Sequence, residues 1–293
     1  MMRKLKAVVG KKRLNLKSSQ TIYKTYNGPV IVIVGPTGSG KTGAAIEIAK
    51  GVGSILGLSD SEIGGEVISA DSRAIYKYMD IGTAKPTTEE QKQVPHFGID
   101  LVEPGERFTV SDFKAYAEHK ISEIRTRGHV PIIAGGTGLY IDALIYNYQF
   151  IGKTGEKANI TEATAEQINC SDRQKMVSDY AIFGIKWPAE KLRERLMKRV
   201  NNLFNDKLYA ETKFLVEKYG WDSQAMKSNI YQFAWKYMQG ECSLDEAKKL
   251  NFYDDWHLAK RQLTWFKRND KIIWLPLEKI KPAVLKCIQD GKK

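Results

Sequence analysis

The chain has 293 residues, which is enough for one large α/β core and a smaller additional lobe. Hydrophobic residues make up 42% and charged residues 27%, as in soluble globular proteins, and no apolar run approaches the roughly 20 residues of a membrane span. The three cysteines, Cys170, Cys242 and Cys287, are far apart, which argues against a disulfide scaffold and a zinc module. We therefore expect a cytoplasmic protein without membrane contact.

The formal net charge of +12 is unevenly distributed. Residues 1–28 carry +8, residues 29–187 carry −4 and residues 188–293 carry +8. Basic ends around a slightly acidic core are typical of proteins that bind a polyanion such as RNA, although scattered lysines also occur as a merely solvated surface. Residues 1–28 form a basic extension without the apolar stretch of a secretory signal. An RNA-contacting arm, a disordered tail and a transit-like leader remain open for it.

The first predicted strand, Val30–Val34, leads into a phosphate-binding loop. The loop fits the pattern G-x-x-x-x-G-K-[ST] and is followed by an apolar helix pattern, which is the context that this motif requires. Successive backbone N–H groups of such a loop converge on phosphate oxygens, and the helix N-terminus adds partial positive charge. Lys41 supplies a point charge, and the Thr42 hydroxyl is placed for a Mg²⁺ ion. The residues of the loop are Gly35, Pro36, Thr37, Gly38, Ser39, Gly40, Lys41 and Thr42.

Strand and helix patterns then alternate. A helix with apolar residues every three or four positions begins after the capping box of Thr109 and Asp112. The pattern predicts an α/β fold, with a P-loop NTPase-like parallel sheet, flanking helices and a C-terminal helical lobe. The further strands expected are 67–70, 130–134 and, as the last, 181–186, with nearly continuous helix from Ala189 onward. The expected units are 1–28, the core 29–150, a short polar insert 151–180, and 181–293 with the last core strand and the basic lobe.

Reactive groups follow the predicted strands, at the edge of the sheet where ligands bind in such folds. Asp71, Ser72 and Arg73 follow the second strand, and Thr137 lies in a glycine-rich turn after the next one. Each signal is weak alone, because an aspartate at a strand end is more often a turn or cap residue. Three such strand ends facing one crevice favour a catalytic site.

These segments resemble the tRNA dimethylallyltransferase family. The resemblance covers about residues 30–148 and 180–275 and is carried by the phosphate loop and by three further groups of motifs: Asp71–Tyr76 with Met79–Pro86; Pro95-His96, Ile99-Asp100 and Pro104; and Gly135–Tyr140 with Ala259–Phe266. The run Asp-Ile-Gly-Thr-Ala-Lys-Pro is the most specific of them. The resemblance implies that the loop holds the diphosphate of dimethylallyl diphosphate rather than ATP. The allyl group would pass to N6 of adenine 37, beside the anticodon of certain tRNAs.

The resemblance also implies roles for single residues. Asp71 would accept the proton of the adenine amine, while Lys41, the loop N–H groups and Mg²⁺ would stabilise the leaving diphosphate. Thr137 would bind the leaving oxygen. Arg195 and Arg199 match an Arg-x-x-x-Arg pattern on one helix face, and we expect Arg199 to clamp the diphosphate. The tRNA would meet Asp71, Ser72, Arg73, Ala74 and Thr137.

The C-terminal helix has an apolar seam that must face other helices, so its aromatic residues are expected in the core. Four cations lie largely off this seam and are expected to contact tRNA phosphates: Lys260, Arg261, Lys267 and Arg268. Relatives usually carry a helical insert of several tens of residues after the Gly-Gly-Thr-Gly turn, where this chain has only a short polar stretch. We therefore expect tRNA binding to depend more on phosphate contacts from these four cations and from the basic residues before Asn27.

Three other functions stay open at this point. A phosphate-loop kinase of small metabolites would place ATP in the loop, and a relative that prenylates free adenine nucleotide would keep the chemistry but change the acceptor. A nucleotide-switched RNA binder would not need Asp71 and Thr137 together. We expect a monomer that transfers the dimethylallyl group to tRNA.

Overall fold

The computed structural model describes residues 25–59, 63–150, 179–223 and 225–291. The basic extension up to residue 24 and most of the expected insert, residues 151–178, lie outside the described residues. The last residues of the extension already belong to the core, because the Tyr26 side chain is buried and its backbone N–H donates to the carbonyl of Arg125. No helix in the described ranges combines the length and the apolar character needed to cross a bilayer.

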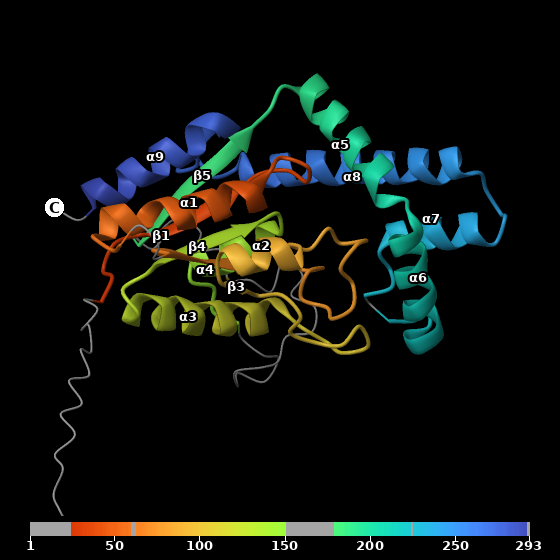
Figure 1. The fold of residues 1–293 in the computed structure, drawn as a ribbon, viewed down its shortest axis with the longest axis horizontal. Helices are drawn as coiled ribbons and strands as arrows, with labels where there is room; N and C mark the ends of the chain where they lie inside the picture. The colour runs from red at the N-terminus through yellow and green to blue at the C-terminus, as the bar shows by residue number, and fades with distance from the viewer. Residues whose placement is uncertain (1–24, 60–62, 151–178, 224, 292–293) are drawn as a thin grey trace, which may run out of the picture.

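A parallel sheet of six strands forms the centre of the core, in the order β3-β2-β4-β1-β5-β6 (Figure 1). The central strands are β-branched runs that are buried on both faces, as expected where helices cover both sides of a parallel sheet. In β1, Val30, Val32 and Val34 face one apolar cluster, while Ile31 and Ile33 face the other. The strands are β1 (Val30–Val34), β2 (Gly65–Ser69), β3 (His96–Phe97), β4 (Val130–Gly135), β5 (Tyr180–Lys186) and β6 (Ile273–Pro276).

Helices cover the two faces of the sheet. α1 and α9 pack side by side on one face, and α3 and α4 pack on the other (Figure 1). The expected capping box at the start of α3 is present, since the Thr109 hydroxyl accepts from the N–H of Asp112 and the Asp112 carboxylate accepts from the N–H of Thr109. The helices of the core are α1 (Lys41–Leu56), α2 (Thr88–Gln93), α3 (Val110–Thr126), α4 (Gly138–Ile145) and α9 (Leu277–Asp290).

A helical lobe lies beside the sheet and encloses a third apolar cluster. Its longest helix, α8, runs from this lobe back to the sheet, where Phe266 joins the core cluster beneath α3 and α4. Phe266 is thus in the core, as expected, and Trp256 is partly buried against the third cluster. The helices of the lobe are α5 (Ala189–Leu203), α6 (Asp206–Tyr219), α7 (Asn229–Met238) and α8 (Leu244–Phe266).

The part of the chain after Ala189 is mostly helical, as expected, but one expectation about it is wrong. The short strand β6 returns to the sheet and pairs with β5, so β5 is not the last core strand. α9 then packs against α1, the helix that follows the phosphate loop. The C-terminal segment therefore belongs to the α/β core and not to the helical lobe.

Candidate active site

The phosphate loop joins β1 to α1 at the edge of the sheet where the parallel strands end. Gly40 precedes α1 with φ +94°, a left-handed conformation that glycine adopts without strain. The loop is supported from outside, because the Trp187 indole donates to the carbonyl of Ser39 at 3.0 Å. The predicted strand, loop and helix are therefore present as expected.

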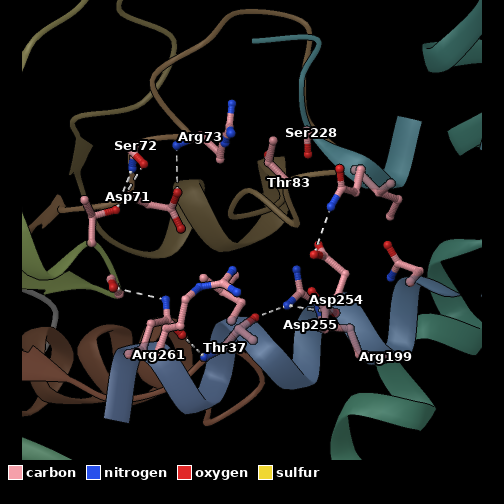
Figure 2. A pocket seen from close by; sticks show the side chains of 18 of the residues that line it. Thr37, Asp71, Ser72, Arg73, Thr83, Arg199, Ser228, Asp254, Asp255 and Arg261 are labelled. Carbon is pink, nitrogen blue, oxygen red and sulfur yellow. Dashed lines mark hydrogen bonds and ion pairs between the residues drawn. The ribbon is translucent and has the colours of Figure 1, made fainter. Parts of the chain in front are cut away.

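Lys41 is the first residue of α1, and its side chain lines a cavity of about 540 Å³. Figure 2 shows other side chains of this cavity, among them Asp71 and Arg199. Its ammonium donates to the carbonyl of Pro36 at 2.8 Å. Burial lowers the pKa of Lys41 to about 8, although the nearby Asp71 carboxylate opposes this shift and Arg199 adds to it. A polyanion entering the cavity would favour the charged form of this lysine.

Asp71 and Thr137 come from the ends of β2 and β4 and line the same cavity as Lys41. The Asp71 Oδ1 atom accepts from the N–H of Arg73 at 2.8 Å, which fixes the carboxylate on its turn. The Thr137 hydroxyl accepts from the N–H of Ser72 at 3.0 Å, so the two strand ends hold each other. Ser72 and Arg73 also line the cavity, whereas Ala74 is buried and is not among the lining residues.

The two arginines of α5 contact different parts of the phosphate loop. Arg199 lines the cavity, and its guanidinium donates to the Thr37 hydroxyl. Arg195 instead donates to the carbonyl of Gly38 at 2.8 Å and stacks on Trp187, with its guanidinium 4.6 Å from the ring centroid. Arg199 is therefore placed as a cation for a ligand, and Arg195 as a support of the loop.

Gln262 on α8 connects the phosphate loop to the glycine-rich turn after β4. Its side-chain oxygen accepts from the N–H of Thr37 at 2.7 Å, and its amide nitrogen donates to the carbonyl of Gly136 at 3.0 Å. A Cβ atom at Gly136 would lie 2.3 Å from this amide nitrogen, so a larger residue there would displace the Gln262 side chain from its present contacts. Sequence reasoning quoted Gln262 only as part of a motif and gave it no role.

One face of α8 forms a wall of the cavity, and Arg261 is the one residue of this wall to which sequence reasoning gave a role. The lining residues of this face follow the three- and four-residue spacing of one side of a helix: Asp254, Asp255, Leu258, Arg261, Gln262 and Trp265. Figure 2 shows Asp254, Asp255 and Arg261 of this set. Asp255 Oδ2 lies 3.8 Å from Arg199 Nη1, and burial raises the pKa of Asp255 against the effect of this arginine. Asp254 accepts from the Asn229 amide at 2.9 Å. The apolar seam of α8 was recognised in the sequence, and this polar face is offset from it.

The four predicted phosphate contacts are all exposed, at and just beyond the C-terminal end of α8. Arg261 lines the main cavity, and Lys260, Arg261 and Arg268 line an open groove that shares Arg261 and Trp265 with that cavity. The Arg268 guanidinium lies 4.0 Å from the centroid of Trp265. Lys267 lies outside both sets of lining residues. A basic surface therefore continues outward from the cavity.

The loop between β2 and α2 carries the Asp-Ile-Gly-Thr-Ala-Lys-Pro run, and two charged side chains hold it. Lys85 is buried, with 2% of its side chain exposed, and its ammonium donates to Asp80 at 2.5 Å, to Asp100 at 2.6 Å and to the carbonyl of Tyr76 at 2.9 Å. Glu211 on α6 accepts from the N–H groups of residues 80, 81 and 82 at 2.8–2.9 Å. This loop begins with Asp71 and also supplies Thr83 to the cavity, so these contacts position one wall of the site.

Comparison with known proteins gives the same family along most of the chain. A family model described as IPP transferase matches residues 74–177 and 151–269. A tRNA dimethylallyltransferase of Acetivibrio thermocellus is 37% identical, in an alignment that covers 84% of this chain and 91% of that protein. One from Staphylococcus haemolyticus is 35% identical over 85% of this chain and 87% of its own length.

Solved structures resemble this fold over nearly its whole length. The tRNA isopentenylpyrophosphate transferase of Bacillus halodurans gives a TM-score of 0.72 at 28% identity and covers 90% of this chain and 98% of that one. The corresponding tRNA delta(2)-isopentenylpyrophosphate transferase of Staphylococcus epidermidis gives 0.71 at 33% identity, with 92% and 100% covered.

The alignments also show a difference in length. The first alignment has 296 positions, and 84% of 293 residues is about 246, so about 50 positions have no residue from this chain. The two ranges matched by the family model overlap at residues 151–177. With a family match over more than half of its length and relatives above 30% identity, this chain belongs to the IPP transferase family of prenyltransferases.

Proposed function

We propose that the protein transfers the dimethylallyl group of dimethylallyl diphosphate to N6 of adenine 37 in tRNA and releases diphosphate. The observation that carries this proposal is the convergence of the phosphate loop, Asp71, Thr137 and Arg199 on one cavity. Two cations, Lys41 and Arg199, line the cavity where a diphosphate would bind, and the carboxylate of Asp71 belongs to the same cavity. Diphosphate and a base amine can therefore occupy the cavity together.

In the proposed reaction, the bond between the allylic carbon and the diphosphate oxygen breaks, and a bond from that carbon to N6 forms. The proton released by N6 passes to the carboxylate of Asp71, whose orientation the Arg73 N–H fixes. Negative charge gathers on the leaving diphosphate, and Lys41 and Arg199, two cations in the cavity wall, would stabilise it. The Ser72 N–H donates to the Thr137 hydroxyl and holds it in place. Thr137 donates its own proton to the Ser72 hydroxyl at 3.3 Å in the free site, and it would turn this proton to the leaving oxygen when the donor binds.

Mg²⁺ fits this site as an ion that arrives with the diphosphate. No group of three or more acidic, histidine or cysteine side chains in the described ranges could hold a metal without a ligand. Mg²⁺ bound to a diphosphate needs only one or two protein oxygens, because water and phosphate oxygens fill the other positions. We propose that the Thr42 hydroxyl, at the start of α1, is one of these oxygens. The ion would neutralise charge on the leaving diphosphate.

A free adenine nucleotide is the second candidate acceptor. The observation that favours it is the absence of about 50 aligned positions relative to the Acetivibrio thermocellus protein. If those positions correspond to the helical insert, this chain has less protein surface with which to hold a large RNA. The basic surface of Lys260, Arg261 and Arg268 beside the cavity favours tRNA instead.

The experiment that tests the proposal supplies donor labelled in its allyl group together with Mg²⁺ and either unmodified tRNA or AMP. We expect label in tRNA at adenine 37 and release of diphosphate. Label on AMP alone would select the second acceptor. Absence of transfer to both acceptors, together with phosphoryl transfer from ATP to a small molecule, would contradict the prenyltransferase proposal and favour a kinase.

A further inference from the structure

Tyr78 is an exposed tyrosine in a backbone conformation that suits glycine. Its φ is +65°, and 44% of the residue is exposed. A bulky side chain is rare in this left-handed region, and such strain persists where the surrounding structure holds the residue and often marks a functional site. The ring contributes little to a buried core at this position, so packing alone does not explain the strain.

Tyr78 belongs to a small aromatic surface that we name the Tyr78 platform, consisting of Tyr78, Phe214 and Lys218. The rings of Tyr78 and Phe214 meet edge to face, with their centroids 5.6 Å apart and an angle of 70° between their planes. Phe214 is 42% exposed. The Lys218 ammonium lies 4.6 Å from the Tyr78 centroid and 5.5 Å from the Phe214 centroid. Two exposed rings and a cation thus lie together on the surface.

The platform is connected to a wall of the cavity by direct contacts. Phe214 and Lys218 follow Glu211 on α6 at intervals of three and four residues, so they lie on the helix face that holds the loop of residues 80–82. On the other side, the Thr83 hydroxyl, in the cavity wall, donates to the carbonyl of Met79 at 2.5 Å. Met79 is the next residue after Tyr78. The platform therefore has a fixed position relative to the cavity.

Three lysines lie around the platform and can contact a negatively charged partner. Lys77 lies 3.3 Å from the Glu103 carboxylate, and Lys218 lies 4.0 Å from the same group, so two cations share one carboxylate. Lys213, on the exposed side of α6, pairs with Glu217 at 3.9 Å. These three lysines outnumber the two glutamates by one, and the nearby group of Lys85, Asp80 and Asp100 has one carboxylate in excess. The lysines can contact phosphates while the rings contact a base.

We propose that the Tyr78 platform stacks on a base of the tRNA that neighbours the adenine in the cavity, with Lys218 turned to its phosphate. This inference rests on the proposed function, with tRNA as acceptor. An adenine that enters the cavity must leave the base stack, which exposes the face of its neighbour. Aromatic side chains replace lost stacking for single-stranded bases, and nearby cations bind the backbone. Because the platform has a fixed position relative to the cavity wall, it contributes part of the binding of tRNA.

The decisive variant is Tyr78→Gly, because glycine removes the ring and accepts φ +65° without strain. We expect the urea midpoint of this variant to stay the same or rise, the KM for tRNA to increase roughly tenfold, and kcat and the KM for the donor to stay within about twofold. Tyr78→Phe should have the wild-type KM for tRNA, because stacking needs the ring and not the hydroxyl. Phe214→Ala should also raise the KM for tRNA.

Tyr253→Ala is the matched control. Tyr253 is also 44% exposed and also meets a phenylalanine edge to face, with 5.6 Å between its centroid and that of Phe252. We expect this variant to keep the KM for tRNA. A direct signal comes from 2-aminopurine placed beside the target adenine in an anticodon stem-loop. Its fluorescence should be quenched when the stem-loop binds wild type and much less when it binds Tyr78→Gly.

The outcomes separate this inference from the proposed function. If wild type modifies tRNA and Tyr78→Gly has the same KM for tRNA and the same quenching, the platform is refuted and the function stands. If wild type modifies AMP and does not modify or bind tRNA, both fail. Sedimentation could instead show that the wild type is a dimer and that Tyr78→Gly is a monomer. The Tyr78 platform would then contact a second copy of the chain, and its proposed role in tRNA binding would be refuted.

Discussion

Lys85→Met removes the charge that holds the loop between β2 and α2. The lysine side chain is 2% exposed and donates to three oxygens, whereas the Asp80 and Asp100 side chains are 60% and 44% exposed. Methionine fills a similar volume but leaves these oxygens without their donor. Water can reach the two carboxylates, while the carbonyl of Tyr76 belongs to a residue with only 4% exposure.

The expected loss of unfolding free energy is about 3 kcal/mol. Removing one partner of a buried ion pair costs about 3–5 kcal/mol, and the exposure of both carboxylates places this case at the lower end. A single hydrogen bond to a charged group contributes about 1.5–3 kcal/mol. Loss of the bond to the Tyr76 carbonyl and of part of one bond to a carboxylate therefore also gives a loss of about 3 kcal/mol. A protein of this size should then melt several degrees earlier.

Urea unfolding followed by circular dichroism measures this loss, and transfer of labelled allyl measures its effect on the site. Asp71 begins the same loop, so we expect the transfer rate to fall more than tenfold even where the protein remains folded. Lys50→Met is the control: Lys50 also pairs with a carboxylate, Glu47 at 3.5 Å, but its side chain is 42% exposed. An exposed pair of this kind contributes less than about 1 kcal/mol.

A loss below about 1 kcal/mol in Lys85→Met, equal to that of Lys50→Met, would refute this reasoning. It would mean that the loop keeps its conformation through Glu211 alone. An unchanged transfer rate in a clearly destabilised Lys85→Met would instead show that the loop does not need its present conformation for Asp71 to act.

Three further predictions follow from the site and the core. Asp71→Asn should lower the transfer rate by about 10²–10⁴ while diphosphate still competes with the donor, and near wild-type turnover would remove Asp71 from the mechanism. Burial lowers the pKa of Lys41 to about 8 in the free site, so diphosphate binding at pH 9 should take up a proton, with little uptake at pH 6.5 and none in Lys41→Ala. Calorimetry in two buffers of different ionisation enthalpy measures this, and absence of uptake at pH 9 would show that the free lysine is already charged. Burial opposes ionisation of Glu66, yet hydrogen bonds from His129 and Arg127 outweigh it and lower its pKa to about 2, below the ordinary 4.5. The stability that this ionisation contributes is complete above pH 4.5 and is lost as the pH falls toward 2. Glu66→Gln should therefore lower the free energy of unfolding by about 3 kcal/mol at pH 7 and by about 1 kcal/mol at pH 3. Urea unfolding measures both values, and an equal loss at the two pH values would contradict this prediction.

The sequence predicted the parts of the site that local patterns encode. The phosphate loop, Asp71 and Thr137 each follow a β-branched run, and the rule that parallel strands end at one edge was sufficient to bring them together. Arg199 was chosen over Arg195 from the resemblance, and it is Arg199 that lines the cavity. These residues needed only short-range patterns and one rule of topology.

The contributions of α8 and of the loop contacts could not be predicted in this way. Gln262 accepts from Thr37 across 225 positions of sequence, and no periodicity records such a contact. Lys85 lies in a recognised motif, but lysine is exposed by default, so its burial depends on the two aspartates that the folded loops bring to it. The sequence did not predict the conformation of Tyr78 either, because the positive φ of this residue is a property of the folded loop.

The edge strands were missed for a related reason. β3 has two residues and β6 has four, ending at Pro276, and Ile273 in β6 is 52% exposed. Such short segments with a partly exposed edge lack the alternation or the long apolar run that identifies a central strand. Their strand conformation depends on the neighbours β2 and β5.

The return of β6 and α9 to the core determines when the core can be completed during synthesis. Ile280, Val284 and Ile288 of α9 are buried against the face that α1 presents. A nascent chain that has emerged only as far as α8 therefore leaves this apolar face uncovered and the edge of β5 unpaired. Domains generally fold as units as they leave the ribosome, and exposed strand edges and apolar faces promote aggregation. The helical lobe can pack early, whereas α1, the helix that follows the phosphate loop, is covered by α9 only after residues 277–290 have been made.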